Sequence, residues 1–110
     1  MSYKVIPTPE FKKLFKKLAK KYPSLKADLQ QLIDTLIEEP KTGIDLGHGI
    51  HKVRMAIASK SKGKSGGARV ITFLITGDLE VYLVHIYDKS ELDNLTKDQI
   101  LDLLKKAGLI

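Results

Sequence analysis

Apolar residues recur through the first part of the chain with the period of an amphipathic helix. Over residues 9–22 an apolar residue returns every third or fourth position, and lysines fill most of the positions between them. Thr8 is a favourable N-cap, and Pro9 occupies the first helical position, where a backbone N–H has no intrahelical partner. The pattern therefore predicts a helix from Pro9, preceded by a short strand over 3–7 that Pro7 ends.

A second helical pattern begins directly after Pro23. Leucine and isoleucine form one apolar face over 25–39, Ser24 can cap the first turn, and Pro40 lies just beyond the end. Because the connection is so short, the two helices are expected to form an antiparallel hairpin. Residues 40–49 contain three glycines and are expected to form a loop.

The second half of the chain has the composition of strands until its last helix. Runs rich in valine, isoleucine and aromatic residues predict strands over 50–58, 68–76 and 80–87, and the middle run is apolar on both faces. Thr96 and Gln99 have the spacing of a capping box and open a final helix. The predicted fold is α+β in the order β-α-α-β-β-β-α, with the helical hairpin packed on a small, mainly antiparallel sheet.

Composition and charge narrow the class of protein. The 110 residues are expected to form a single domain, and the absence of cysteine excludes disulfides and cysteine-based zinc sites. Neither a signal peptide nor an apolar run long enough to span a bilayer is found, so the chain is expected in the cytoplasm. Lys and Arg outnumber Asp and Glu by 19 to 13, which favours a polyanionic partner such as nucleic acid.

Cations also gather on one face of the predicted sheet. Strand alternation places Lys52 and Arg54 together, opposite to the apolar positions of their strand. Arg69 opens the most apolar strand, and a guanidinium beside buried surface either forms an ion pair or lines a groove. Across the predicted hairpin, Tyr87 and Lys89 return beside Arg69. Together these residues predict a cationic concavity with an aromatic rim, which suits RNA phosphate and base stacking.

The loop SKSKGKSGG, residues 59–67, carries Lys60, Lys62 and Lys64 next to this concavity. We expect it to contact RNA phosphate, although a solvated loop without function would have the same composition. It does not match a Walker loop, because its GKS leads into a strand and lacks the upstream glycine spacing.

A second basic surface is predicted on the first helix, where Lys12, Lys16 and Lys20 share the polar side. This surface has two interpretations. It is either a solvated helix face or a surface that follows the phosphates of a large RNA.

The three histidines of the chain do not have the spacing of a metal site, and no metal or cofactor is predicted. His85 alternates with Leu83 and Tyr87, so it is expected on their face of the strand. It either titrates in the groove or is a hydrogen-bonded histidine of the core.

Three stretches of the sequence together match the pattern of a known family. They are the entry helix PEFKKLFKKLAKKYPSL, the segment HKVRMAIASKSKGKSGGARVITF and the corner YLVHIYDKSELDNLT. In these stretches and in its order of elements, the chain resembles the RelE/ParE toxin superfamily of bacterial toxin–antitoxin systems, and most closely the HigB/RelE-type toxins. The resemblance implies an endoribonuclease that needs no metal, cuts mRNA in the ribosomal A site and is silenced by a cognate antitoxin.

The resemblance also implies roles for the residues of the concavity. The family's basic pair falls on Lys52 and Arg54, near the 2′-OH, and of the two only Lys52 is suited to act as a base. Arg69 would clamp the phosphate, and Lys89 would assist the phosphate or the leaving group.

The sequence departs from the family in one respect. Some members carry a tyrosine in the C-terminal segment as part of the site, whereas this chain has no tyrosine or histidine after Lys89. Tyr87 or His85 would then stack on a base or relay a proton in its place, or the proton chemistry differs.

Two other functions are compatible with the same fold. A ParE-type toxin inhibits DNA gyrase and has no nuclease activity, but such chains usually lack the full basic cluster. A non-catalytic RNA-binding relic would keep the fold without the chemistry, which the missing C-terminal tyrosine favours. All three would bind an acidic, helical antitoxin segment across the groove or the helical hairpin.

Overall fold

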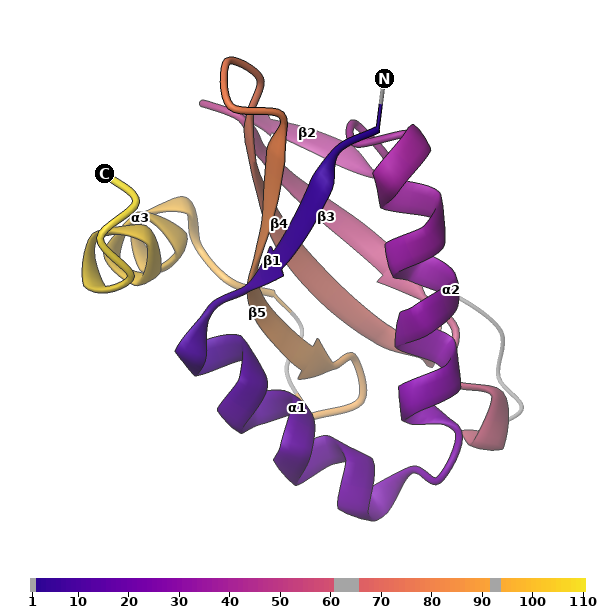
Figure 1. The fold of residues 1–110 in the computed structure, drawn as a ribbon. Helices are drawn as coiled ribbons and strands as arrows, with labels where there is room; N and C mark the ends of the chain where they lie inside the picture. The colour runs from indigo at the N-terminus through magenta and orange to yellow at the C-terminus, as the bar shows by residue number, and fades with distance from the viewer. Residues whose placement is uncertain (1, 61–65, 92–93) are drawn as a thin grey trace.

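The computed structural model describes residues 2–60, 66–91 and 94–110, and Figure 1 labels its helices and strands. In chain order the elements are β1 (Lys4–Pro7), α1 (Pro9–Lys21), α2 (Leu25–Glu38), β2 (Ile44–Gly47), β3 (Ile50–Met55), the 3₁₀ helix η1 (Ala58–Lys60), β4 (Ala68–Ile75), β5 (Glu80–Asp88) and α3 (Lys97–Lys106). The predicted α+β fold is confirmed, with three helices packed on a five-stranded, mostly antiparallel sheet.

The strands form one sheet in the order β1-β5-β4-β3-β2. β1 runs parallel to β5, which is possible because α1 and α2 carry the chain away from the sheet before the antiparallel strands begin. The other neighbouring strands are antiparallel. β4 lies at the centre of the sheet, which explains why its sequence is apolar on both faces.

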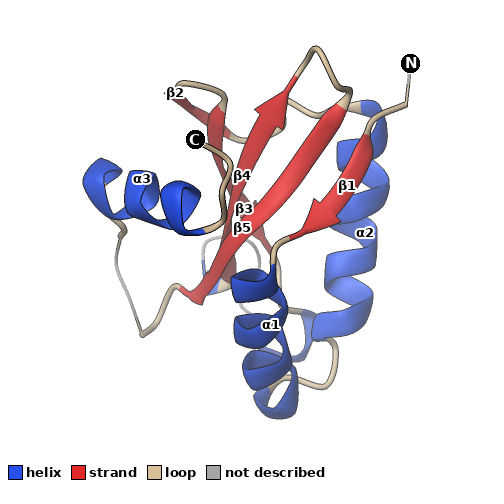
Figure 2. Cartoon of the chain, turned by 60° about the vertical axis from the view of Figure 1, so that its left-hand side comes forward, coloured by secondary structure: helices blue, strands red, loops and turns tan. Residues whose placement is uncertain are grey.

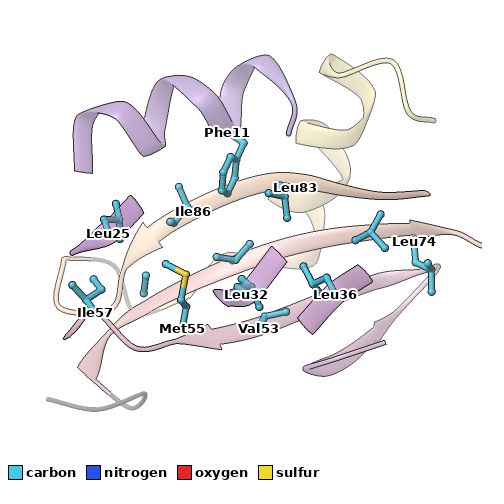
Figure 3. Close-up of a cluster of buried hydrophobic side chains, with 13 residues drawn as sticks. Phe11, Leu25, Leu32, Leu36, Val53, Met55, Ile57, Leu74, Leu83 and Ile86 are labelled. Atoms are coloured by element: carbon cyan, nitrogen blue, oxygen red, sulfur yellow. The ribbon is translucent and has the colours of Figure 1, made fainter. Parts of the chain in front are cut away.

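The helices α1 and α2 cover one face of the sheet and form the larger hydrophobic core. Figure 3 shows Phe11 of α1 reaching toward Leu83 and Ile86 of β5. From α2, Leu36 is fully buried and belongs to the same cluster as Val53 of β3. As predicted, the apolar faces of the first two helices pack on the sheet and bury one of its faces.

The opposite face is covered only in part. Ile100 and Leu104 of α3 pack there on Ile50 and Ile71. Figure 2 shows α3 on the other side of the sheet from α1 and α2. Beyond this smaller cluster, toward the end of β5, the same face carries the polar residues described below.

Two of the three predicted helix caps are confirmed. The Phe11 N–H donates to Thr8 Oγ1 over 3.2 Å, and Thr96 forms the predicted capping box with the first turn of α3. Ser24 does not cap α2, because its backbone is already helical and its side chain makes no capping hydrogen bond. Ser24 Oγ instead accepts a hydrogen bond from the N–H of Ser59 over 2.9 Å, which ties the start of α2 to η1.

The prediction of a loop over 40–49 was wrong, because Ile44–Gly47 form strand β2, which pairs with β3. This edge strand is short and largely exposed, and its register is irregular, so it has no apolar alternation that the sequence could reveal. The predicted strand over 50–58 is also shorter than expected. It ends at Met55, and the chain then turns into η1 over Ala58–Lys60.

We expect Leu36→Ala to lower the free energy of unfolding by about 2–5 kcal/mol, because the substitution leaves a cavity under a fully buried side chain. Urea denaturation measures this change through the midpoint at constant slope. Ile110→Ala is the matched control, since Ile110 is 57% exposed and its truncation should change stability by less than about 0.5 kcal/mol. Equal effects of the two substitutions would contradict the position of the core.

Candidate active site

The register of the three central strands brings the predicted site residues into two neighbouring rows. In the first row, Arg54 of β3 lies opposite Arg69 of β4, which in turn lies opposite Tyr87 of β5. In the second row, Lys52 lies opposite Ile71, and Ile71 lies opposite His85. Directly opposed residues in antiparallel strands have Cβ atoms about 4.5–5.5 Å apart. We call the surface formed by these two rows, on the face that α3 covers in part, the cationic face.

A β-bulge places His85 on the cationic face. The pairing of β4 with β5 shifts between Ile71 and Thr72, so Ile71 pairs with His85 but Thr72 pairs with Leu83. Leu83 therefore lies in the core under α1 and α2, whereas Val84 packs in the cluster beneath α3. The expectation that His85 shares a face with both Leu83 and Tyr87 was wrong for Leu83, because a bulge interrupts strict alternation.

The two arginines of the first row, Arg54 and Arg69, differ in how far their side chains are exposed. Arg54 is exposed, whereas Arg69 is only 5% exposed and donates from Nη1 to the carbonyl of Ala68 over 3.1 Å. Like charges in directly opposed positions of a sheet are destabilising. An anion such as a phosphate would stabilise this arrangement, because guanidinium groups bind phosphate oxygens in pairs.

Tyr87 and His85 place two buried polar atoms next to these cations. The Tyr87 hydroxyl and His85 Nδ1 are both buried and have no hydrogen-bond partner among the described residues. Burial raises the pKa of the Tyr87 phenol, an effect that the charge of Arg69 opposes. Burial also lowers the pKa of the His85 imidazole, while the charge of Glu10 acts in the opposite direction. At neutral pH a neutral phenol and a largely neutral imidazole therefore stand side by side, with ring centroids 6.1 Å apart.

A cavity of about 310 Å³ opens beside these two rings, between β5 and α1. His85 and Tyr87 line it from the strand, and Leu14 and Leu18 line it from the helix. Lys17 and Lys21 of α1 and the acids Asp88 and Glu91 also line the cavity. It therefore combines apolar walls with two polar rings and charged groups of both signs.

The remaining predicted cations of the concavity lie at its borders. Lys52 is half-buried and donates from Nζ to Asn94 Oδ1 over 3.2 Å, so it is held by the segment that leads into α3. Lys89 follows β5 directly, and its backbone N–H donates to the carbonyl of Gly67 over 3.0 Å. The antiparallel pairing of β4 and β5 therefore continues for one more step and fixes where Lys89 leaves the sheet.

Lys60 has a different environment from the one predicted. Its amino group is buried and forms an ion pair with Asp88 Oδ1 at 2.8 Å, so this lysine does not face solvent as an RNA-binding residue would. It also lies over the ring of Tyr22, 5.3 Å from the ring centroid. Lys62 and Lys64, the other two predicted lysines of this loop, lie outside the described residues.

The basic surface of the first helix is separate from the cationic face. Lys12, Lys16 and Lys20 are all exposed on α1, and α1 packs on the other face of the sheet. They do not join the two rows, so any contact that they make with RNA would be a contact outside the reaction centre.

The most buried charged group of this region was not among the predicted site residues. Asp88 is 1% exposed and accepts hydrogen bonds from Lys60 Nζ, from Tyr22 Oη, and from Ser90 through both its N–H (3.0 Å) and its hydroxyl (2.8 Å). We call these four residues the Asp88 cluster. The sequence does indicate that Asp88 is unusual, because it is an acid on the core-facing side of an apolar strand. A buried acid requires partners, but the sequence does not identify them.

Neither a metal site nor a membrane span is visible in the described part of the chain. No group of three or more His, Cys, Asp or Glu side chains within 2–60, 66–91 and 94–110 could hold a metal ion. The described helices are also too short or too polar to cross a bilayer.

Comparisons with known proteins identify the family of this fold and site. Residues 10–110 match the family model described as the RelE toxin of the RelE/RelB toxin–antitoxin system. The chain therefore belongs to the RelE toxin family and is the toxin component of a toxin–antitoxin system, with a cognate antitoxin as its partner. Its fold is similar to that of E. coli toxin RelE, solved in the free state as a double arginine-to-alanine mutant, with a TM-score of 0.65 and 14% identity over 96% of this chain and 98% of that one.

The Asp88 cluster predicts a specific dependence of stability on pH. Although burial raises the pKa of the Asp88 carboxyl, hydrogen bonds from its three partners hold that pKa well below its ordinary value. Because the pKa is lower in the folded state, the stabilisation is complete above about pH 4 and is lost as the pH falls further. Asp88→Asn should lower the free energy of unfolding at pH 7 by about 3–5 kcal/mol, because it leaves the charge of Lys60 buried without its partner.

This prediction is checked by urea denaturation of both proteins between pH 7 and pH 2. The difference in unfolding free energy between wild type and Asp88→Asn should shrink as the pH falls below about 4. A difference that stays constant to pH 2 would show that the carboxylate charge does not contribute.

Proposed function

We propose that this toxin is a ribosome-dependent endoribonuclease that cuts mRNA through the 2′-OH of the message without a metal ion. The observation that carries the proposal is the cationic face, where opposed arginines, a lysine, a buried phenol and an imidazole lie on adjacent positions of three strands. Family membership supports it, since the chain is a RelE toxin. The arrangement offers the groups that RNA cleavage requires, namely charge stabilisation for a phosphate and neutral groups for proton transfer.

In the proposed reaction the 2′-oxygen attacks the neighbouring phosphorus, and the 5′-oxygen of the next nucleotide leaves. Lys52 stands near the 2′-OH, and the unprotonated form of its amine takes the proton of that hydroxyl. Arg54 and Arg69 bind the non-bridging oxygens of the pentavalent phosphate. Lys89 stabilises the leaving 5′-oxygen, which takes up a proton relayed by Tyr87 or His85 and departs as a hydroxyl. The products are a 2′,3′-cyclic phosphate and a 5′-hydroxyl, and no bound metal enters the step.

His85 and Tyr87 provide the proton transfer and stacking that the missing C-terminal tyrosine would otherwise supply. Burial keeps both side chains neutral near pH 7, so each can hold or pass a proton at a heteroatom that has no described partner. The cavity beside them has aromatic and apolar walls as well as two lysines of α1, Lys17 and Lys21, which suits a base and its phosphate next to the cut.

The partners follow from the same charge distribution. On the ribosome, the exposed lysines of α1 would contact rRNA phosphates while the cationic face meets the message in the A site. The antitoxin would lay an acidic, helical segment across the cationic face or the α1–α2 pair and so exclude RNA.

Induced expression in a bacterial host tests the proposed activity. Wild type should arrest growth and create new in-frame 5′ ends in a reporter message, detected by primer extension. Arg69→Ala should reduce cleavage by roughly 100- to 1,000-fold, as expected for loss of one charged group that stabilises a transition state. Lys26→Ala, which removes an exposed cation of α2 outside the site, is the matched control and should cut like wild type.

The alternatives give distinct results in the same experiment. Arrest with intact message would contradict the nuclease and indicate inhibition of gyrase. A folded wild-type protein that causes neither arrest nor cleavage would indicate a binding module without chemistry.

The α1 lysines make a separate prediction about affinity. A triple variant with Lys12→Ala, Lys16→Ala and Lys20→Ala should bind ribosomes more weakly, with the slope of log K against log salt reduced in magnitude by roughly 2. Binding measured over a range of salt concentrations checks this slope. An unchanged slope would show that these side chains form a solvated helix face.

A further inference from the structure

The Asp88 cluster joins three parts of the chain at the end of the cationic face. Tyr22 follows the last turn of α1, Lys60 ends η1, and Ser90 lies in the turn after β5. η1 is itself fixed to α2, because the N–H of Ala58 donates to Asp28 Oδ2 over 3.2 Å. Asp88 therefore connects the end of β5 to the whole helical layer on the far side of the sheet.

The residues beside Asp88 in the sequence are the ones that the proposed reaction uses. Asp88 and Tyr87 leave the strand on opposite faces, because side chains alternate along β5 here. Asp88 pairs with Ala68, the neighbour of Arg69, and Lys89 lies between two members of the cluster. Any rotation of the strand end would thus move Tyr87 and Lys89 relative to Arg69.

Stability alone is a weak explanation for a buried ion pair at this position. Removing two charges from water is costly, and well-packed apolar residues in place of a buried ion pair often leave a protein equally stable or make it more stable. The cluster does fix the orientation of the Asp88 side chain, because both of its carboxylate oxygens accept hydrogen bonds from donors on separate elements. A fully satisfied polar network of this kind holds one arrangement.

We propose that Asp88 is a positioning residue of the cleavage site, which acts through Lys60 and Tyr22 to fix Tyr87 and Lys89 beside Arg69. The inference rests on the proposed function, since cleavage is the activity that depends on this geometry. Asp88 is only 1% exposed and its carboxylate is engaged by Tyr22, Lys60 and Ser90, so its influence on RNA is indirect, through these neighbours.

An apolar replacement separates positioning from stability. Asp88→Leu and Lys60→Met each leave a buried charge without its partner and should lower the melting temperature. The double variant Asp88→Leu/Lys60→Met buries no charge and should recover most of that loss. Its single-turnover cleavage of ribosome-bound message should nevertheless stay roughly 100-fold below wild type, the order of loss expected from a misplacement of about 1 Å.

Two further variants make the test decisive. Tyr22→Phe removes one hydrogen bond from the cluster with little change of shape, and should slow cleavage about tenfold while the protein remains folded. Asp34→Asn alters the exposed carboxylate of α2 that accepts a hydrogen bond from Gln30 Nε2 over 3.0 Å, and should leave the rate unchanged. If the double variant and Tyr22→Phe both cleave within threefold of wild type, the cluster only stabilises the fold and the inference is overturned.

A second readout keeps the inference separate from the proposed function. In wild type the rings of His85 and Tyr87 are close enough for nuclear Overhauser effects between ring-edge protons. The double variant should lose or weaken these effects, and Asp34→Asn should keep them. If wild type cuts no message, the proposed function fails, and these effects still decide whether Asp88 orients Tyr87. Effects that persist unchanged in the double variant would contradict the positioning.

Discussion

The arrangement of the whole cationic face depends on the register of β4 between its two antiparallel neighbours. Because Arg69 pairs with Arg54 on one side and with Tyr87 on the other, one strand fixes three functional side chains at once. A slip of β4 by one residue would turn Arg69 toward the helices and bring an apolar residue of β4 between Arg54 and Tyr87. The register is held from the other face, where Val70 and its cross-strand partners Val53 and Ile86 are buried in the main core.

The same arrangement creates a conflict between stability and function. Opposed arginines repel each other, and a buried phenol and imidazole without described hydrogen-bond partners each cost free energy. The unequal cover of the sheet makes this tolerable, because α1 and α2 bury one face thoroughly while α3 leaves part of the other open. Costs of this kind, concentrated on one surface, are typical of binding and catalytic sites.

Sequence reasoning succeeded where a regular period governs the structure. Alternation placed Lys52 and Arg54 on one face and Val53 and Met55 on the other, and helical spacing identified α1, α2 and α3. It failed where the local structure departs from a period. The bulge beside His85 leaves no mark in composition, and β2 is too short and too exposed to show alternation.

Long-range polar contacts were the other limit of prediction from sequence. Lys60 was expected to contact RNA phosphate from its loop. Its partner in the structure, Asp88, lies 28 positions away in the sequence, and only the folded chain brings the two together. Ser24 read as a helix cap for the same reason, since its actual contact is Ser59 of η1. In both places the sequence correctly indicated a polar group that needs a partner, a cation in one and a hydroxyl in the other. It could not indicate which partner, because that residue is distant in the sequence and becomes a neighbour only in the tertiary structure.

The central proposal is that the cationic face cuts RNA through the 2′-hydroxyl. The most direct measurement is cleavage by the purified toxin of a ribosome-bound message in which the nucleotide before the cut carries a single 2′-deoxy substitution. We expect the all-RNA message to be cut to a 2′,3′-cyclic phosphate and a 5′-hydroxyl in the presence of a chelator, and the 2′-deoxy message to be bound but not cut. Equal cleavage of both messages would contradict it.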